Sequence, residues 1–320
     1  MNLLRRSLSK SLLITPIKSV GVTEPRSIKR WVAPTLRELR KRAKKIDLQN
    51  QPNPRSGFVE WNYRAELYAF TKRLNENIDI SLLQTAFTQK SYIHKEANRQ
   101  RDLGIEETDI QINDNLKLSE HGENIAKAYI STYLQYSLPK VPEEGRNAIL
   151  KYLTSIETLA YIALHLGMKD LLLDTEYPPT SEALSRSLLA VIGALQESSG
   201  SERSFLFVRD FICTHLNQRD LLEIWHIQDA WNLLKDTCKL QNIPNPEPRL
   251  IGDCGKNTVL ATYNVGIYAN KKMIGKGFGE DASTAIEIAA IDSLRNLFSI
   301  NEHARLFDFE LLIEPKQKLN

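Results

Sequence analysis

The 320-residue sequence has few cysteines and no long apolar run, and both absences limit the class of protein. Cys213, Cys238 and Cys254 form no C-x-x-C pair and have no paired histidines nearby. This spacing predicts neither a disulfide framework nor a zinc site, so we expect three buried free thiols in a reducing compartment. No apolar run is long enough for a secretory signal or a membrane span.

Acidic residues are absent from the first 23 positions, which carry four basic residues and four serines. Leucines can form an apolar helical stripe between these bases, at Leu3, Leu4, Leu8, Leu12 and Leu13. This composition is typical of a mitochondrial presequence, which we place at residues 1–30, and it predicts import into the mitochondrial matrix. The alternative is a basic tail without a targeting role.

Positive charge is concentrated at the N-terminus. Residues 1–45 hold 13 Lys and Arg against two acids, whereas the remainder holds 29 bases and 37 acids. The distribution predicts a basic arm and linker at residues 31–57, with a short helix that binds RNA phosphate; a solvated charge run is the alternative. The candidate contacts in the arm are Arg37, Arg40, Lys41, Arg42, Lys44 and Lys45.

Hydrophobic periodicity divides the rest of the chain into two domains. Residues 58–226 have the three- and four-residue spacing of helices, interrupted by an acidic segment at residues 99–113 that we expect to be a loop. Residues 227–299 predict the order α-β-β-β-α, and residues 300–320 form a tail. The predicted elements are a helix at 228–240, an extended segment at 248–252, strands at 258–268 and 271–277, and a helix at 282–298. The fold class is therefore α + α/β multidomain.

Two motifs in the helical region resemble the ribonuclease III family. Residues 82–92, LLQTAFTQKSY, are similar to the helix that opens its nuclease domain, and residues 153–167 are similar to its "S-x-x-x-L-A…LG" helix. The resemblance implies an all-helical ribonuclease III-like domain. It also implies pairing with a second such domain, in a homodimer or a heteromer.

The family's metal-ligand positions are mostly changed. The motif L-E-F-L-G-D corresponds to residues 118–123, LSEHGE, so Ser119 replaces one carboxylate and Glu123 keeps a longer version of the other. The partner motif places Arg186 and Leu189 at its two acidic positions. Because hydrolysis of this type needs carboxylates to hold a metal, the resemblance implies no enzyme activity, no metal and no cofactor. The alternative is a shifted Mg²⁺ site built on Glu120 and Glu182.

The C-terminal region resembles a double-stranded RNA-binding domain through residues 275–294, in which GKGFG leads into Ala285, Ala289 and Leu294. The two lysines that the family places at the start of the last helix are Ala282 and Ser283 here. Free duplex recognition is therefore expected to be impaired. The candidate RNA contacts in this domain are Lys256, Asn257, Lys271, Lys272 and Lys276.

Together the presequence and the two altered domains resemble the ribonuclease III-like proteins of the mitochondrial large ribosomal subunit. The resemblance implies a structural subunit that binds the large-subunit ribosomal RNA and neighbouring mitochondrial ribosomal proteins, and that supports translation and subunit assembly. One alternative is an active Mg²⁺-dependent mitochondrial endonuclease that cleaves double-stranded RNA. Another is an RNA-binding regulator outside the ribosome.

Overall fold

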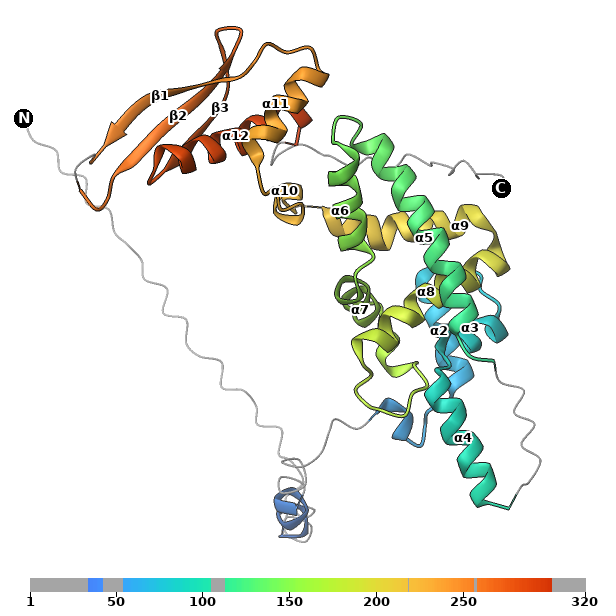
Figure 1. Ribbon diagram of the computed structural model, residues 1–320. Coiled ribbons are helices and arrows are strands. Elements are labelled where there is room, and N and C mark those ends of the chain that lie inside the picture. The colour runs from blue at the N-terminus through green and yellow to red at the C-terminus, as the bar shows by residue number, and fades with distance from the viewer. Residues whose placement is uncertain (1–33, 43–53, 105–112, 218, 256–257, 301–320) are drawn as a thin grey trace, which may run out of the picture. The chain divides into compact units, whose positions relative to one another are not determined.

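The computed structural model describes residues 34–42, 54–104, 113–217, 219–255 and 258–300 (Figure 1). The chain divides into two compact units, residues 1–51 and 52–320. In the first unit, residues 34–42 form the basic helix that the sequence predicts, and all nine residues are exposed. The predicted presequence and nearly all of the predicted tail lie outside the described residues. The proposed domain boundaries stay predictions.

Residues 55–240 are helical, with no strand among the residues described there, which confirms the predicted class of the larger domain. Short 3-10 helices lie at Arg55–Gly57 (η1), Met168–Asp170 (η2) and Cys213–Leu216 (η4), and η3 is a π-helix at Val208–Ile212. The α-helices are α2 (Tyr63–Leu74), α3 (Ile80–Phe87), α4 (Lys90–Asp102), α5 (Leu116–Ser137), α6 (Glu143–Leu153), α7 (Ile156–His165), α8 (Ser181–Ser199), α9 (Ser201–Phe207), α10 (Leu221–Ile224) and α11 (Ala230–Leu240).

Helix α8 forms the centre of the helical domain. Eleven of its 19 residues are buried, and they surround the helix rather than forming one stripe, as expected for a core helix. Its start is fixed by Thr180, whose side chain accepts a hydrogen bond from the backbone N–H of Ala183. Helices α3, α5 and α7 pack against it, so the motif-bearing segments of the sequence meet around one element.

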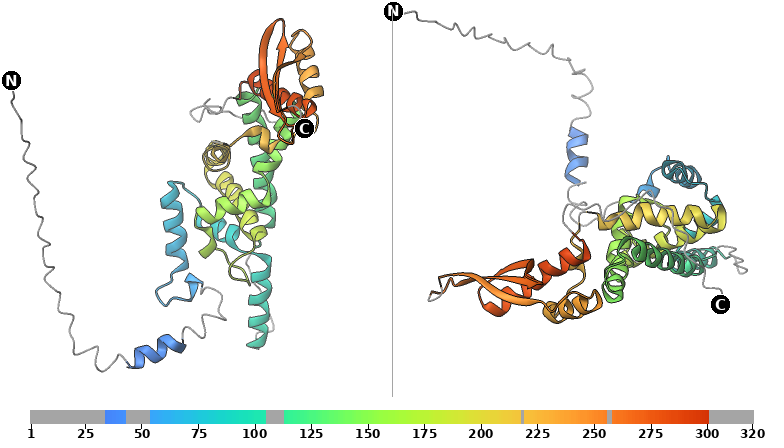
Figure 2. Two further views of the ribbon diagram at one scale, coloured as in Figure 1. Left: turned by 90° about the vertical axis from the view of Figure 1, so that its left-hand side faces the viewer. Right: turned by 90° about the horizontal axis from the view of Figure 1, so that it is seen from above.

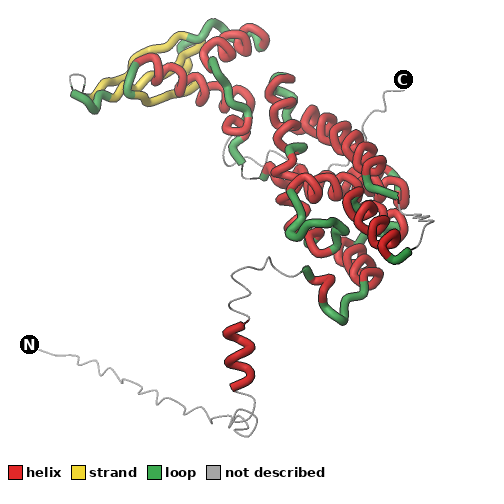
Figure 3. Tube along the Cα trace, turned by 60° about the horizontal axis from the view of Figure 1, so that its bottom comes forward, coloured by secondary structure: helices red, strands yellow, loops and turns green. Residues whose placement is uncertain are grey.

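The C-terminal domain is a three-stranded antiparallel sheet with helices α11 and α12 on one side. Strands β1 (Glu247–Cys254), β2 (Thr262–Ala269) and β3 (Lys272–Gly279) lie in sequence order and are followed by α12 (Ala282–Phe298). Figure 3 shows the three strands, in yellow, side by side in one sheet. The predicted α-β-β-β-α order is confirmed.

Some predicted boundaries are wrong. Strand β2 begins at Thr262 rather than Thr258, because Thr258 donates its backbone N–H to Gly255 O (2.8 Å) and closes a turn. Lys271 is not in a strand: Asn270 and Lys271 both have positive φ and form the two-residue loop of the β2–β3 hairpin.

Helix α4 continues to Asp102, into the segment predicted as a loop, and residues 105–112 lie outside the described part of the chain. The prediction of three buried thiols is also wrong. Cys213 and Cys238 are buried, but Cys254 is exposed because it ends the edge strand β1, all eight residues of which are exposed. In the part of the chain that the structure describes, no helix has the length and apolar character needed to cross a membrane.

Candidate functional site

Helices α5 and α8 cross at two glycines. A Cβ added to Gly122 would lie 1.9 Å from the backbone oxygen of Leu189, and one added to Gly193 would lie 2.4 Å from the backbone oxygen of Leu118. No side chain separates the two backbones at this point. The crossing therefore brings together the two segments that carry the predicted metal-ligand positions, one from each helix.

The residues at those positions are already engaged or lack oxygen ligands. Ser119 is buried, and its hydroxyl donates a hydrogen bond to Leu116 O (2.7 Å) within α5. Glu123 is about half exposed and forms an ion pair with Lys127 (2.5 Å) on the same helix. Arg186 and Leu189 are half-buried on α8. The structure thus leaves one carboxylate among the four positions, and that carboxylate has a lysine partner.

The two acids of the alternative, shifted Mg²⁺ site lie at the surface. Glu120 and Glu182 are both exposed. Among the described residues no group of three or more His, Cys, Asp or Glu side chains is arranged to hold a metal ion.

Two buried amides, which the sequence analysis did not assign a role, hold the crossing in place. Gln89 donates through Nε2 to Ala183 O (3.2 Å) and Ser187 Oγ (3.0 Å) on α8. Asn115, which precedes α5, donates through Nδ2 to Ala86 O (3.2 Å) on α3. The signal for Gln89 was its place in the opening motif of residues 82–92. Its partners could not be predicted because they lie 94 and 98 residues away.

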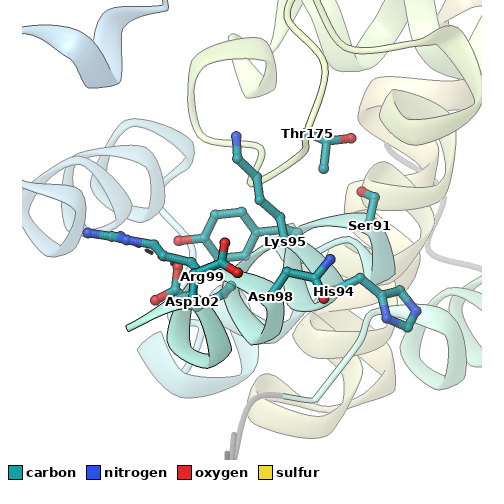
Figure 4. Close-up of a pocket in the computed structure, with 9 residues that line it drawn as sticks. Ser91, His94, Lys95, Asn98, Arg99, Asp102 and Thr175 are labelled. Atoms are coloured by element: carbon teal, nitrogen blue, oxygen red, sulfur yellow. Dashed lines mark ion pairs between the residues drawn. The ribbon is translucent and has the colours of Figure 1, made fainter. Parts of the chain in front are cut away.

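A cavity of about 710 Å³ lies beside α4 (Figure 4), and its lining includes Lys95, Glu96, Arg99 and Asp102. Arg99 forms an ion pair with Glu96 (3.6 Å). The two cations and two carboxylates balance, so the cavity lacks the excess positive charge that a phosphate site needs.

The RNA-contact candidates of the arm lie along one exposed helix. Arg37, Arg40, Lys41 and Arg42 are all exposed at residues 34–42. Glu38 forms long ion pairs with Lys41 and Arg42, both at 3.9 Å, which leave these bases accessible. Lys44 and Lys45 lie outside the described residues.

The described candidates of the C-terminal domain lie on β3 and at its hairpin. Lys271 and Lys272 lie at the β2–β3 hairpin, where Lys272 pairs with Ala269. Lys256 and Asn257 lie outside the described residues. Lys276 is exposed midway along β3.

The start of α12 has no base. Ala282 and Ser283 are exposed there, directly after Glu280 and Asp281, which are also exposed. A helix N-terminus attracts anions, but two carboxylates at this end oppose the approach of phosphate. The start of α12 therefore carries two acids and no base.

The fold and the crossing helices define the class of protein: a ribonuclease III-like helical domain followed by a double-stranded RNA-binding-type domain. A family model described as "Large ribosomal subunit protein mL44, endonuclease domain" matches residues 62–195, and one described as "MRPL44 dsRNA-binding domain" matches residues 225–318. The chain belongs to the mL44 family.

Curated relatives agree with this assignment. The chain is 30% identical over 256 residues to the large ribosomal subunit protein mL44 of Caenorhabditis elegans, covering 79% of this chain and 64% of that one. It thus spans just under two thirds of that relative. It is 24% identical over 225 residues to ribonuclease 3 of Enterococcus faecalis, covering 68% of this chain and 91% of that one.

Among solved structures, the nuclease domain of ribonuclease III from Campylobacter jejuni is similar, with 22% identity and a TM-score of 0.39. The match covers 48% of this chain and 97% of that one.

Proposed function

We propose that this protein is a structural component of the mitochondrial large ribosomal subunit, located in the matrix, that binds ribosomal RNA and neighbouring ribosomal proteins. The observation that carries the proposal is the match of both mL44 domain families, in order, on one chain. In this function the two domains are scaffolds, and they support translation and subunit assembly without performing hydrolysis.

The absence of catalysis is part of the proposal, and the α5–α8 crossing supports it. Mg²⁺ prefers several oxygen ligands in near-octahedral geometry, and phosphodiester hydrolysis uses the metal to activate water and stabilise the leaving oxygen. The Ser119 hydroxyl donates a hydrogen bond to the backbone oxygen of Leu116 in its own helix, Arg186 is a cation, and Leu189 has no side-chain oxygen. Glu123 alone cannot hold the ion.

A sucrose gradient of mitochondrial lysate at high salt tests the ribosomal assignment. We expect the protein to migrate with the large-subunit ribosomal RNA at a constant ratio after washing in salt. Migration near the top of the gradient would contradict the proposal and favour a free regulator or nuclease. Salt matters because contacts made only by phosphate neutralisation weaken steeply as the salt concentration rises.

Cleavage of double-stranded RNA by the purified full chain tests the absence of catalysis. We expect no Mg²⁺-dependent cleavage from the wild type, from Glu123→Ala, or from Glu144→Ala, a control at an exposed acid on α6. Cleavage that requires Mg²⁺ and is lost only in Glu123→Ala would establish the nuclease instead. Glu120→Ala and Glu182→Ala test the shifted site in the same assay.

The basic arm is proposed to neutralise RNA phosphate. Substituting alanine for Arg37, Arg40, Lys41 and Arg42 removes up to four phosphate contacts. The slope of the logarithm of the RNA association constant against the logarithm of the salt concentration should therefore become less steep by about 3. Lys235→Ala with Lys239→Ala, on α11, is the control for a general loss of positive charge. An unchanged slope in the arm variant would remove the arm from the RNA contact.

A further inference from the structure

The two faces of the C-terminal sheet are packed differently. Gly275, Gly277 and Gly279 of β3 face α12: a Cβ on each would lie within 2.6 Å of an atom of that helix. The apolar side chains on the opposite face include Ile251, Tyr268, Met273 and Phe278, which we call the outer-face patch; Lys276 lies on the same face, and Arg249 lies over the ring of Tyr268 (5.5 Å). A Cβ on Gly266 would lie 2.7 Å from Ile251 and 3.1 Å from Tyr268, so these two meet above β2, and Tyr268 pairs with Met273 across the hairpin.

The outer-face patch is exposed. Phe278 is 52% accessible, Ile251 49% and Met273 47%. Both helices of the domain lie on the other face of the sheet, where α11 packs against α12 (Figure 2). An apolar cluster of this kind on a small domain marks an interaction surface, because exposed apolar area is unfavourable in water.

Side chains of α12 occupy part of the free edge of β3. Asp292 of α12 accepts a hydrogen bond from the backbone N–H of Lys276 (2.9 Å), and Asn296 donates through Nδ2 to the backbone oxygen of Ile274 (2.8 Å). These side chains satisfy two of the backbone groups of β3 that an added strand would use, which disfavours strand addition at this edge. The outer-face patch is the surface that remains for a segment that leaves α12.

The chain after α12 has an apolar pattern that suits the outer-face patch. Phe307, Phe309, Leu311 and Ile313 recur at every second position, and Leu306, Asp308, Glu310 and Leu312 alternate with them. An extended segment with this pattern has one wholly apolar side and one side that also carries two acids. The match to the MRPL44 dsRNA-binding domain runs to residue 318, 20 residues past the end of α12, so the family includes this segment in the domain.

Helix α12 ends close to the outer-face patch, beside the start of β3. Because Gly279 meets Ala285 while Gly275 meets Ser293, α12 runs antiparallel to β3 and ends beside the first residues of that strand, next to Met273. Five extended residues after Ile300 span about 17 Å, which exceeds the thickness of one layer of the domain, about 10 Å. The next residues can therefore reach the opposite face.

We propose that residues 306–313 of the same chain bind the outer-face patch in an extended conformation, with Phe307, Phe309, Leu311 and Ile313 against it. Asp308 and Glu310, with Leu306 and Leu312 on the same side, then face solvent. The bound segment gives the sheet a second layer and removes the patch from contact with other proteins.

The three methionines of the chain provide a direct test, because hydrogen peroxide oxidises methionine according to its exposure. Met273 lies in the patch, and the fully buried Met168 is an internal reference. A segment bound nine-tenths of the time slows oxidation of Met273 about tenfold. We therefore expect the double variant Phe309→Ser, Leu311→Ser to oxidise at Met273 about tenfold faster than the wild-type full chain, with Met168 unchanged.

Asp308→Ser with Glu310→Ser is the matched control, since it alters the solvent-facing side of the same segment. Peptide mass spectrometry measures each sulfoxide separately. Equal Met273 rates in the wild type and the Phe309→Ser, Leu311→Ser variant would overturn the proposal. Protection that disappears on dilution would assign the patch to a second copy of the chain, and protection found only in the ribosomal particle would assign it to a partner; both results overturn the proposal. The assay on the isolated chain does not depend on the ribosomal assignment.

Discussion

The two domains achieve close backbone packing in different ways. In the helical domain, α5 and α8 each contribute one glycine, Gly122 and Gly193, to a single point of contact. In the C-terminal domain one strand supplies three glycines in a row of alternate positions, and α12 faces them with Ala285, Ala289 and Ser293. A helix crossing needs space at one point, whereas a helix lying along a strand needs it at every second residue.

The comparison separates scaffold from chemistry. Glycine stands where two backbones touch, whereas positions close by have room for a side chain. Ser119 and Leu189 each lie one turn from a crossing glycine, and Ala282 follows the last glycine of β3 by three residues. Backbone contact thus restricts the residue type at the glycines and places no such restriction on the side chains of Ser119, Leu189 and Ala282.

The largest expected effect comes from filling the helix crossing. Gly122→Ala places a Cβ 1.9 Å from Leu189 O, and the atom it meets is backbone that cannot rotate away. We expect the free energy of unfolding of the helical domain to fall by about 3 kcal/mol, even after the gain of about 1 kcal/mol in helix propensity. Urea unfolding followed by hydrogen exchange in α5 and α8 measures it.

Gly57→Ala is the control for this prediction, because nothing lies within 4 Å of the added Cβ. A Gly122→Ala variant as stable as Gly57→Ala would mean that the two helices can separate at no cost in free energy. It would contradict the claim that the crossing of α5 and α8 requires glycine.

A somewhat smaller effect is expected in the C-terminal domain. Gly277→Ala places a Cβ 2.3 Å from the backbone nitrogen of Ala289, and α12 must move away from the sheet. We expect a loss of about 2 kcal/mol, since one helix can shift over a two-layer domain more easily than inside a helical core. Hydrogen exchange in β3 and α12 should increase.

Gly252→Ala, on the exposed strand β1 with open space around it, is the matched control. Faster exchange confined to residues 230–300 would show that the two domains open independently. Equal acceleration in α5 and α8 would show one cooperative unit.

Gln89→Ala tests the support of the crossing by hydrogen bonds. The substitution leaves Ala183 O and Ser187 Oγ without their buried donor, so we expect a loss of about 1–3 kcal/mol. Gln84→Ala on the neighbouring helix α3, whose side chain has no hydrogen bond among those of the described residues, controls for the loss of a glutamine. Equal stability of the two variants would mean that Gln89 does not hold α8.

The smallest effect concerns thiol reactivity and leaves the stability unchanged. Burial raises the pKa of the Cys213 thiol to about 12, so at pH 8 it remains protonated and unreactive in the folded protein. Burial also raises the pKa of Cys238. Iodoacetamide at pH 8 should therefore modify the exposed Cys254 first, and the other two only after unfolding. Mass spectrometry of labelled peptides measures the order, and early labelling of Cys213 would contradict its burial.

Local pattern was sufficient for the order of elements. The final helix was predicted at residues 282–298 and is observed at Ala282–Phe298, because its alanines repeat at helical spacing and a strand pattern ends just before it. The start of β2 was predicted four residues too early. Thr258, Val259 and Leu260 have strand-forming composition, but Gly255 with positive φ begins a turn that ends only before Thr262.

The sequence by itself determined the two-domain order, the family resemblance and the residue types at the predicted metal-ligand positions Ser119, Arg186 and Leu189, because each is recorded in residue type and spacing along the chain. Only the tertiary structure decided that Gln89 supports α8, that Lys271 and Lys272 lie at the β2–β3 hairpin, and that apolar side chains are exposed on the face of the sheet opposite α12. The physical reason is that these properties depend on contacts between residues far apart in the chain, which periodicity and local propensity do not encode.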